Sequence, residues 1–201
     1  DVKTALPVLL KDLAHENGAI LIYDEIASGF HFRVGGIQEM DMYGVTPDVA
    51  CFGKGMGNGM PISAIVGSAE IMQIFEQVFF SFSFGGEALS LAACIATIKE
   101  MQDKDVHTHM WEMGARLQDG YNRMSSDLKL EHNSVVMGLP PLTVPIFRDK
   151  SGNDSLLLKS LFQQEALKRG VLFGSAHAIS YSHSEEENID KIKGFKDKYN
   201  L

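Results

Sequence analysis

The sequence has few cysteines, a deficit of positive charge and no long hydrophobic run. Only Cys51 and Cys94 occur in 201 residues, both in apolar surroundings typical of buried free thiols, which favours a reducing, cytoplasmic setting. Lys and Arg number 18 against 26 Asp and Glu, so the net charge of -8 gives nucleic-acid binding no electrostatic support. Because no apolar run approaches the ~20 residues of a membrane helix, we expect no membrane association.

The first residues, DVKTALPVLLKDLAHENGA, lack an initiator Met and the basic start and apolar core of a signal peptide. They show helical spacing over residues 5–17, with Leu6, Leu9, Leu10 and Leu13 on one face and Gly18 placed to end the helix. We therefore expect the chain to begin in the middle of a domain.

Apolar runs alternate with helical stripes along the rest of the chain, which predicts an α/β fold. The run at 19–23 is continuously apolar, as in a parallel strand covered on both faces. Further strands are predicted at 48–53, 63–68, 143–147, 171–173 and 178–182, and helices from 87, over 105–125 and over 155–169. Residues 138–142, GLPPL, predict a loop, and Ser184 with Glu187 predicts a final helix. The two blocks, 1–104 and 105–201, are both α/β.

The segment CFGKGMGNGMPIS, residues 51–63, places a single lysine after an apolar run and among glycines. The Walker pattern does not fit, because Asp48 stands at its first glycine and Gly55 at the position that must be Ser or Thr. The alternating glycines also miss the dinucleotide spacing. The glycines Gly53, Gly55, Gly57 and Gly59 either let the backbone approach a ligand or simply make a tight turn.

Asp24 and Lys54 each follow a predicted strand, and ligand sites in open α/β sheets lie at the carboxyl ends of strands. A lysine of lowered pKa can form a Schiff base with an aldehyde cofactor. A carboxylate beside a pyridine nitrogen keeps that nitrogen protonated and makes the ring an electron sink. On spacing alone a strand-end salt bridge or a helix cap is the commoner explanation of such a pair.

Two stretches, LIYDEIASGF and PDVACFGKGMGNGMPISAIVG, resemble the class-III (fold-type I) pyridoxal-phosphate aminotransferases. SFSFGGEALSLAAC, PPLTVPIF and AISYSHSEEENID are similar to later parts of that family, particularly its glutamate-1-semialdehyde aminomutase branch. The resemblance implies part of the mostly parallel sheet of a cofactor-binding large domain in residues 1–104 and a smaller carboxyl-terminal α/β domain in 105–201. It covers nearly the whole chain but only about the second half of a typical member.

The resemblance also implies how pyridoxal 5'-phosphate is bound. Lys54 would form the Schiff base and shuttle a proton, while Asp24 would pair with the pyridinium nitrogen. Ser83 would contact the cofactor phosphate of the neighbouring subunit, which implies a homodimer. Ala27 stands where many members place a polar residue near the phenolic oxygen of the cofactor, so that contact would be missing.

Two further residues are candidates near the substrate. Glu25 would lie behind the cofactor contacts or at the subunit interface, and it is equally well explained as an acid at a helix start. His31 replaces an arginine of related sequences, which would change the charge offered to substrate near neutral pH. Glu87 replaces a common asparagine and is a weak pointer to keto-sugar substrates.

The implied activity is amino-group transfer between small molecules, on a keto-sugar or a keto or aldehyde acid. A glutamate-1-semialdehyde-type aminomutase, a nonenzymatic pyridoxal carrier and an inactive dimerisation or binding module are the alternatives. Members of the family draw the phosphate loop and the ring-stacking aromatic residue from their first half, so this chain alone is expected to bind the cofactor poorly.

The histidines predict no metal site. His107 and His109 are two positions apart in a predicted helix, which points them to different faces and favours a solvated helix. His177 and His183 flank a short predicted strand and could line a substrate entrance, although structural or surface roles are commoner. Trp111 and its neighbouring methionines fit a packing stripe.

Overall fold

The computed structural model of the chain describes residues 2–37 and 45–184 and divides into two compact units, Asp1–His107 and Thr108–Leu201. The first unit contains α1 (Val2–Glu16), β1 (Ile22–Asp24), β2 (Val49–Phe52), the 3-10 helix η2 (Lys54–Gly57), β3 (Ala64–Gly67), α2 (Ala69–Met72), the 3-10 helix η3 (Gln73–Glu76) and α3 (Ala88–Asp103). The chain continues through α4 (Val106–Asp127), β4 (Ser134–Leu139), β5 (Leu142–Phe147), α5 (Leu156–Lys168) and β6 (His177–Ala178).

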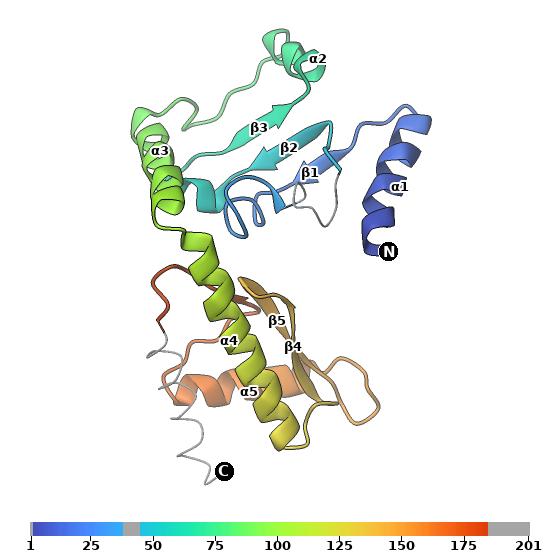
Figure 1. Ribbon diagram of the computed structural model, residues 1–201, viewed down its shortest axis with the longest axis vertical. Helices are drawn as coiled ribbons and strands as arrows, with labels where there is room; N and C mark the ends of the chain where they lie inside the picture. Colours follow the sequence, from blue (N-terminus) through green and yellow to red (C-terminus); the bar gives the residue numbers. More distant parts are fainter. Residues whose placement is uncertain (1, 38–44, 185–201) are drawn as a thin grey trace. The chain divides into compact units, whose positions relative to one another are not determined.

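The first unit is built on a three-stranded sheet in which β2 lies between β1 and β3 (Figure 1). β1 and β2 are parallel, with Asp24 opposite Cys51, whereas β3 is antiparallel to β2. The three predicted strands are present, although the first begins only at Ile22. Ile20 and Ile22 are about half exposed, at 51% and 54%. The predicted cover on both faces of β1 is therefore not found among the described residues.

Polar contacts hold α1 at the amino ends of the two parallel strands. The Asp48 carboxylate, just before β2, lies 2.9 Å from His15 Nε2 and accepts the Leu21 N–H at 2.6 Å. The Leu21 N–H and the His15 side chain hold the pKa of Asp48 below its usual range. Lys11 Nζ donates to the Thr46 carbonyl at 2.8 Å. These contacts hold α1 at the amino ends of the parallel strands, opposite the carboxyl ends that carry Asp24 and Lys54.

The apolar face predicted for α1 is only partly covered. Leu9, Leu10 and Leu13 are 61%, 48% and 52% exposed. The leucine spacing thus predicts the helix correctly, while the described residues do not supply a partner for the whole stripe.

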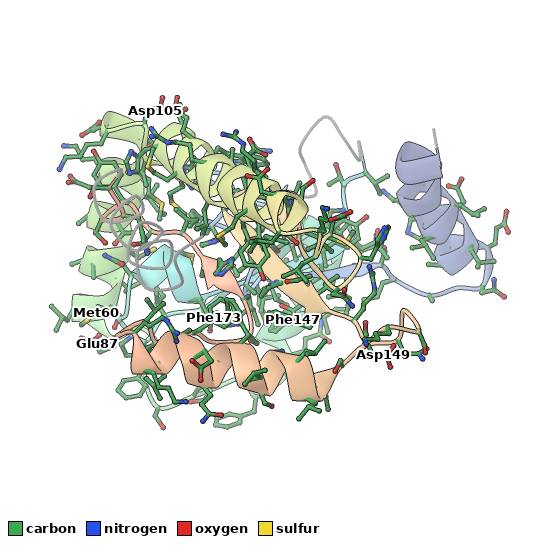
Figure 2. The ribbon with its side chains drawn as sticks, turned by 90° about the horizontal axis from the view of Figure 1, so that it is seen from below. Met60, Glu87, Asp105, Phe147, Asp149 and Phe173 are labelled. Atoms are coloured by element: carbon green, nitrogen blue, oxygen red, sulfur yellow. The ribbon has the colours of Figure 1, made fainter. Side chains whose placement is uncertain are left out.

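The second unit packs helices on an antiparallel sheet in the order β4–β5–β6. β4 and β5 form a hairpin joined by Pro140 and Pro141, in the segment predicted to be a loop. The ring centroid of Phe162 in α5 lies 5.1 Å from the ring centroids of both Phe147 and Phe173. Figure 2 shows Phe147 and Phe173 along the same side of α5, and the three rings form one continuous aromatic contact in this unit.

The remaining element predictions have mixed outcomes. The helices at 88–103, 106–127 and 156–168 are confirmed, and Met110 and Met113 of α4 are buried as the packing stripe predicts. Residues 171–173 form no strand, and 178–182 contributes only its first residue to β6. β4 was not predicted, and the final helix lies outside the described residues.

Candidate active site

Asp24 and Lys54 lie at the carboxyl ends of the two parallel strands. Asp24 is the last residue of β1 and pairs in register with Cys51 of β2, and Lys54 follows the end of β2 after Gly53. Both residues are exposed. Since ligands bind beyond the carboxyl ends of parallel strands, the acid and the amine occupy the edge at which a small molecule would be expected.

The two side chains do not neutralise each other. Among residues 2–37 and 45–184, the Lys54 amine makes no hydrogen bond or ion pair. Asp24 Oδ1 accepts the Ile26 N–H at 3.0 Å, and this is the only hydrogen bond of the carboxylate within the same residues. A strand-end salt bridge between Asp24 and Lys54 is therefore wrong for this structure, and the second carboxylate oxygen remains available.

The turn that carries Lys54 has an unusual backbone. Lys54 has φ 41° and Asn58 has φ 47°, the left-handed region, which asparagine tolerates but which is costly for a lysine. Gly59 has φ 97°. The base of the turn is anchored, because Met56 and Gly57 are buried and α3 packs against η2. Strained residues of this kind persist only where their surroundings fix them, and they concentrate at functional sites.

Glu25 is buried, whereas Ala27 is exposed as Asp24 is. Glu25 is 1% exposed, and the Ser28 hydroxyl donates to its carboxylate. The structure therefore places Glu25 inside the unit, where a substrate would not reach it. Ala27 is exposed in the turn after β1 and offers only a methyl group.

His31 lies in a loop whose neighbouring residue, Phe30, contacts His107 of α4. The sequence did not reveal this contact. His31 is half-buried and packs edge-on against Phe32, with ring centroids 5.3 Å apart. His107 Nε2–H donates to the Phe30 carbonyl at 3.3 Å, and burial lowers the pKa of His107, with smaller lowering effects from His31 and Arg33. The prediction of a solvated helix face for His107 and His109 is therefore wrong, because both are half-buried and His109 Nε2–H donates to the His183 carbonyl at 2.8 Å.

Ser83 is exposed in the turn that precedes α3. Phe79, Phe80, Phe82 and Phe84 surround it in sequence and are 96%, 55%, 45% and 54% exposed. The rings of Phe80 and Phe82 lie 5.7 Å apart, centroid to centroid. A hydroxyl within an exposed aromatic segment is suited to a contact with another chain.

Glu87 has a local structural role. It is the N-cap of α3, and its carboxylate oxygens accept the N–H groups of Leu89 and Ser90, both at 2.7 Å. The hydroxyl and N–H of Ser90 and the N–H of Leu89 lower the pKa of Glu87. These bonds account for the residue without a substrate, so the pointer to keto-sugars receives no support from the geometry.

The second unit contains a cavity of about 280 Å³ that Phe162, Phe173, His177 and His183 help to line. His177 Nδ1 lies 3.2 Å from the Thr143 hydroxyl, and burial lowers the pKa of His177. The described residues contain no cluster suited to a metal ion and no helix that could cross a membrane.

Comparison with known proteins identifies relatives along most of the chain. The family model described as aminotransferase class-III matches residues 3–183. The glutamate-1-semialdehyde 2,1-aminomutase of Haloquadratum walsbyi is 36% identical over 150 residues, covering 72% of this chain and 33% of the relative. The enzyme of the same name from Natronomonas pharaonis is 33% identical, covering 94% of this chain and 50% of the relative. The chain thus spans half or less of the length of these relatives.

Solved structures agree on the fold. The FumI protein of Sphingopyxis sp. MTA144, determined in its PLP internal aldimine form, matches with a TM-score of 0.83 at 22% identity over 96% of this chain and 46% of that one. An omega-transaminase from Sphaerobacter thermophilus matches with a TM-score of 0.82 at 19% identity over 98% of this chain and 48% of that one. The predicted α/β architecture of the fold-type I transaminases is confirmed.

Proposed function

The chain belongs to the class-III aminotransferase family, and we propose that it carries the catalytic lysine of an enzyme that moves amino groups with pyridoxal 5'-phosphate. The observation that carries this proposal is the exposed Lys54 amine, which stands without an ionic partner among the described residues at the sheet edge that also presents Asp24. A lysine kept for packing would be buried, and a lysine kept for a salt bridge would have an ionic partner.

The residues present fit pyridoxal phosphate. Lys54 would hold the aldehyde covalently through its amine, and that amine would also carry the proton that moves during transfer. Asp24 has an uncommitted carboxylate oxygen for a protonated ring nitrogen. Bound pyridoxal phosphate would supply an electron sink for charge that develops at the carbon bearing the amino group.

The other predicted residues divide by accessibility. Ser83 is exposed, as a phosphate ligand of a neighbouring subunit would need to be, and the exposed aromatic residues on either side support a homodimer. Ala27 can contribute van der Waals contact only. His31 would supply a partly buried basic group near the substrate. Glu25 does not act on substrate in this proposal, because it is buried.

The two units would then serve as parts of two domains. Unit Asp1–His107 contains Asp24, Lys54 and Ser83 and would belong to the cofactor-binding large domain. Unit Thr108–Leu201 would form the small carboxyl-terminal domain. The free thiols of Cys51 and Cys94 favour a reducing compartment such as the cytoplasm.

A second candidate function is the aminomutase reaction, in which the amino group is returned to a different carbon of the same molecule. The observation that favours it is the name of the relatives at 33% and 36% identity, glutamate-1-semialdehyde 2,1-aminomutase. Supplying glutamate-1-semialdehyde alone, and separately an amino donor with a keto acid, would separate the two. Turnover without a second substrate identifies the aminomutase.

A trapping experiment tests the role of Lys54. The chain is mixed with pyridoxal phosphate and reduced with borohydride, and the modified peptide is identified by mass spectrometry. We expect a stable adduct on Lys54 that is lost in Lys54→Ala and kept in Lys99→Ala, which removes an exposed lysine of α3. No adduct on Lys54, even when the amino-terminal half of a relative is supplied as a separate polypeptide, would overturn the proposal and leave a binding or dimerisation module.

A further inference from the structure

Glu25 combines a position beside the proposed site with almost complete burial. Successive residues at the end of a strand point to opposite faces, and here Asp24 is exposed while Glu25 is 1% exposed. A buried carboxylate is unfavourable unless other groups satisfy it. The Ser28 hydroxyl donates to Glu25 Oε2, and a Cβ built on Gly36 would lie 2.8 Å from Oε1. The carboxylate therefore binds Ser28 near the start of the loop formed by residues 25–36 and lies close to the backbone of Gly36 at its end.

The loop closes back on its own start. The Gly29 N–H donates to the Glu25 carbonyl at 2.8 Å, and the Phe30 N–H donates to the Gly35 carbonyl at 3.0 Å. Gly29 itself lies so close to the Phe52 ring that a Cβ there would be 2.5 Å from Cδ1. The loop thus rests on the last residue of β2.

The tip of the loop reaches the turn that carries Lys54. The Phe30 ring meets the Phe52 ring edge-on, with centroids 5.7 Å apart, and the Phe30 carbonyl oxygen lies 3.5 Å from a Cβ built on Gly55. Phe30 has φ 58° and Lys54 has φ 41°, so two residues in the costly left-handed region are close along this contact. Such conformations need surroundings that hold them in place.

We propose that Glu25 is a positioning residue for Lys54. Its carboxylate fixes the first turn of loop 25–36 through Ser28, and the loop packs Phe30 against Phe52 and Gly55 so that the strained turn at Lys54 is maintained. Asp24 and Glu25 would then have opposite tasks, one facing a ligand and the other fixing the backbone beside it. This inference rests on the proposed function of Lys54.

Three variants test the inference in the full chain. Glu25→Ala removes the acceptor, Ser28→Ala removes the donor, and Glu25→Gln keeps an oxygen that can accept the Ser28 hydroxyl. Glu70→Ala, which removes an exposed glutamate of α2, is the control. Hydrogen–deuterium exchange is followed in peptides covering 25–36 and 53–57, and the rate of borohydride-trapped labelling of Lys54 by pyridoxal phosphate is measured in parallel.

We expect Glu25→Ala to raise exchange at least tenfold in both segments and to slow labelling of Lys54 at least tenfold. Ser28→Ala is expected to move both readouts in the same direction, whereas Glu25→Gln and Glu70→Ala should stay within threefold of the parent. Recovery in Glu25→Gln is the readout that loss of general stability would not produce. If Glu25→Ala does not fold, Ser28→Ala carries the test.

The outcomes also separate this inference from the function on which it rests. If the parent chain is not labelled at Lys54 even when the amino-terminal half of a relative is supplied, the proposed function fails, and exchange in 53–57 alone decides the role of Glu25. Faster exchange confined to 25–36, or unchanged exchange in both segments, overturns the positioning role. Labelling that falls equally in Glu25→Gln overturns it as well, because the hydrogen bond to Ser28 would then not be the cause.

Discussion

Replacing Gly29 by alanine is a direct test of how loop 25–36 is packed. A Cβ at Gly29 would lie 2.5 Å from Phe52 Cδ1 and 2.8 Å from the Glu25 carbonyl oxygen, far inside ordinary contact distances. The Glu25 oxygen belongs to the backbone and already accepts the Gly29 N–H, so it cannot move away freely. Relief requires the loop to lift from Phe52.

The energies indicate a net loss. Overpacking costs about 1–3 kcal/mol, and a weakened backbone hydrogen bond adds about 1 kcal/mol. Alanine also reduces the entropy of the unfolded chain, which returns about 0.4–1 kcal/mol. We therefore expect loop 25–36 to be less stable by about 2 kcal/mol, which corresponds to roughly 30-fold faster exchange through local opening.

Gly53→Ala is the matched control because Gly53 directly precedes Lys54. Gly53 has an extended backbone with φ -173°, and the nearest atom to a Cβ there is Ile26 Cγ2 at 3.5 Å. We expect exchange in 25–36 to be unchanged or slower in this variant. Fluorescence of Trp111, the one tryptophan of the sequence and a residue of the second unit, monitors whether each variant stays folded elsewhere. Equal exchange in Gly29→Ala and the parent, or faster exchange in Gly53→Ala than in Gly29→Ala, would refute the packing argument.

Two further predictions concern the second unit, and both can be measured by urea unfolding with Trp111 fluorescence. Helix propensity alone predicts that Gly114→Ala raises the free energy of unfolding by up to about 1 kcal/mol. The new Cβ would lie 1.9 Å from the Pro140 carbonyl oxygen, so we expect a loss of about 3 kcal/mol instead. Gly174→Ala, where no atom lies within 4 Å of the new Cβ, is the control and should stay within about 0.5 kcal/mol of the parent, and a stabilised Gly114→Ala would contradict the prediction. Burial lowers the pKa of His177, so the unfolded chain takes up the proton first and stability falls as the pH drops through about 6.5. His177→Asn cannot titrate and should lose less stability between about pH 7.5 and pH 5.5; parallel losses in the two proteins would count against this assignment.

The positions of Asp24 and Lys54 were predictable because they depend on local patterns. An apolar run that stops at an acid, and a second run that stops at a lysine, define two strand ends without any knowledge of tertiary contacts. The parallel pairing of β1 with β2 then brings the two ends to one edge. Sequence could not decide between a salt bridge and a ligand site, since that choice depends on whether the side chains meet in space.

The buried contacts around the site were not predictable in this way. Glu25 follows Asp24 in the sequence, and only the direction of each side chain relative to the sheet separates an exposed acid from a buried one. His107 was assigned to a solvated helix face, yet its partner is the backbone of Phe30, far away in the sequence. Periodicity describes the helix on which a residue lies and carries no information about a loop that packs against it.

The glycines near Lys54 show how the structure refines a compositional argument. Gly59 needs a left-handed φ of 97°, and a Cβ on Gly57 would lie 2.5 Å from Ile62 Cγ2, so these two positions favour glycine. Gly53 and Gly55 have ordinary space, with no atom nearer than 3.5 Å to a Cβ built there. The residue that opposes its backbone preference is Lys54, because glycine or asparagine would adopt φ 41° at lower cost. A lysine at such a position is expected where the amine itself is required, which agrees with the role proposed for it.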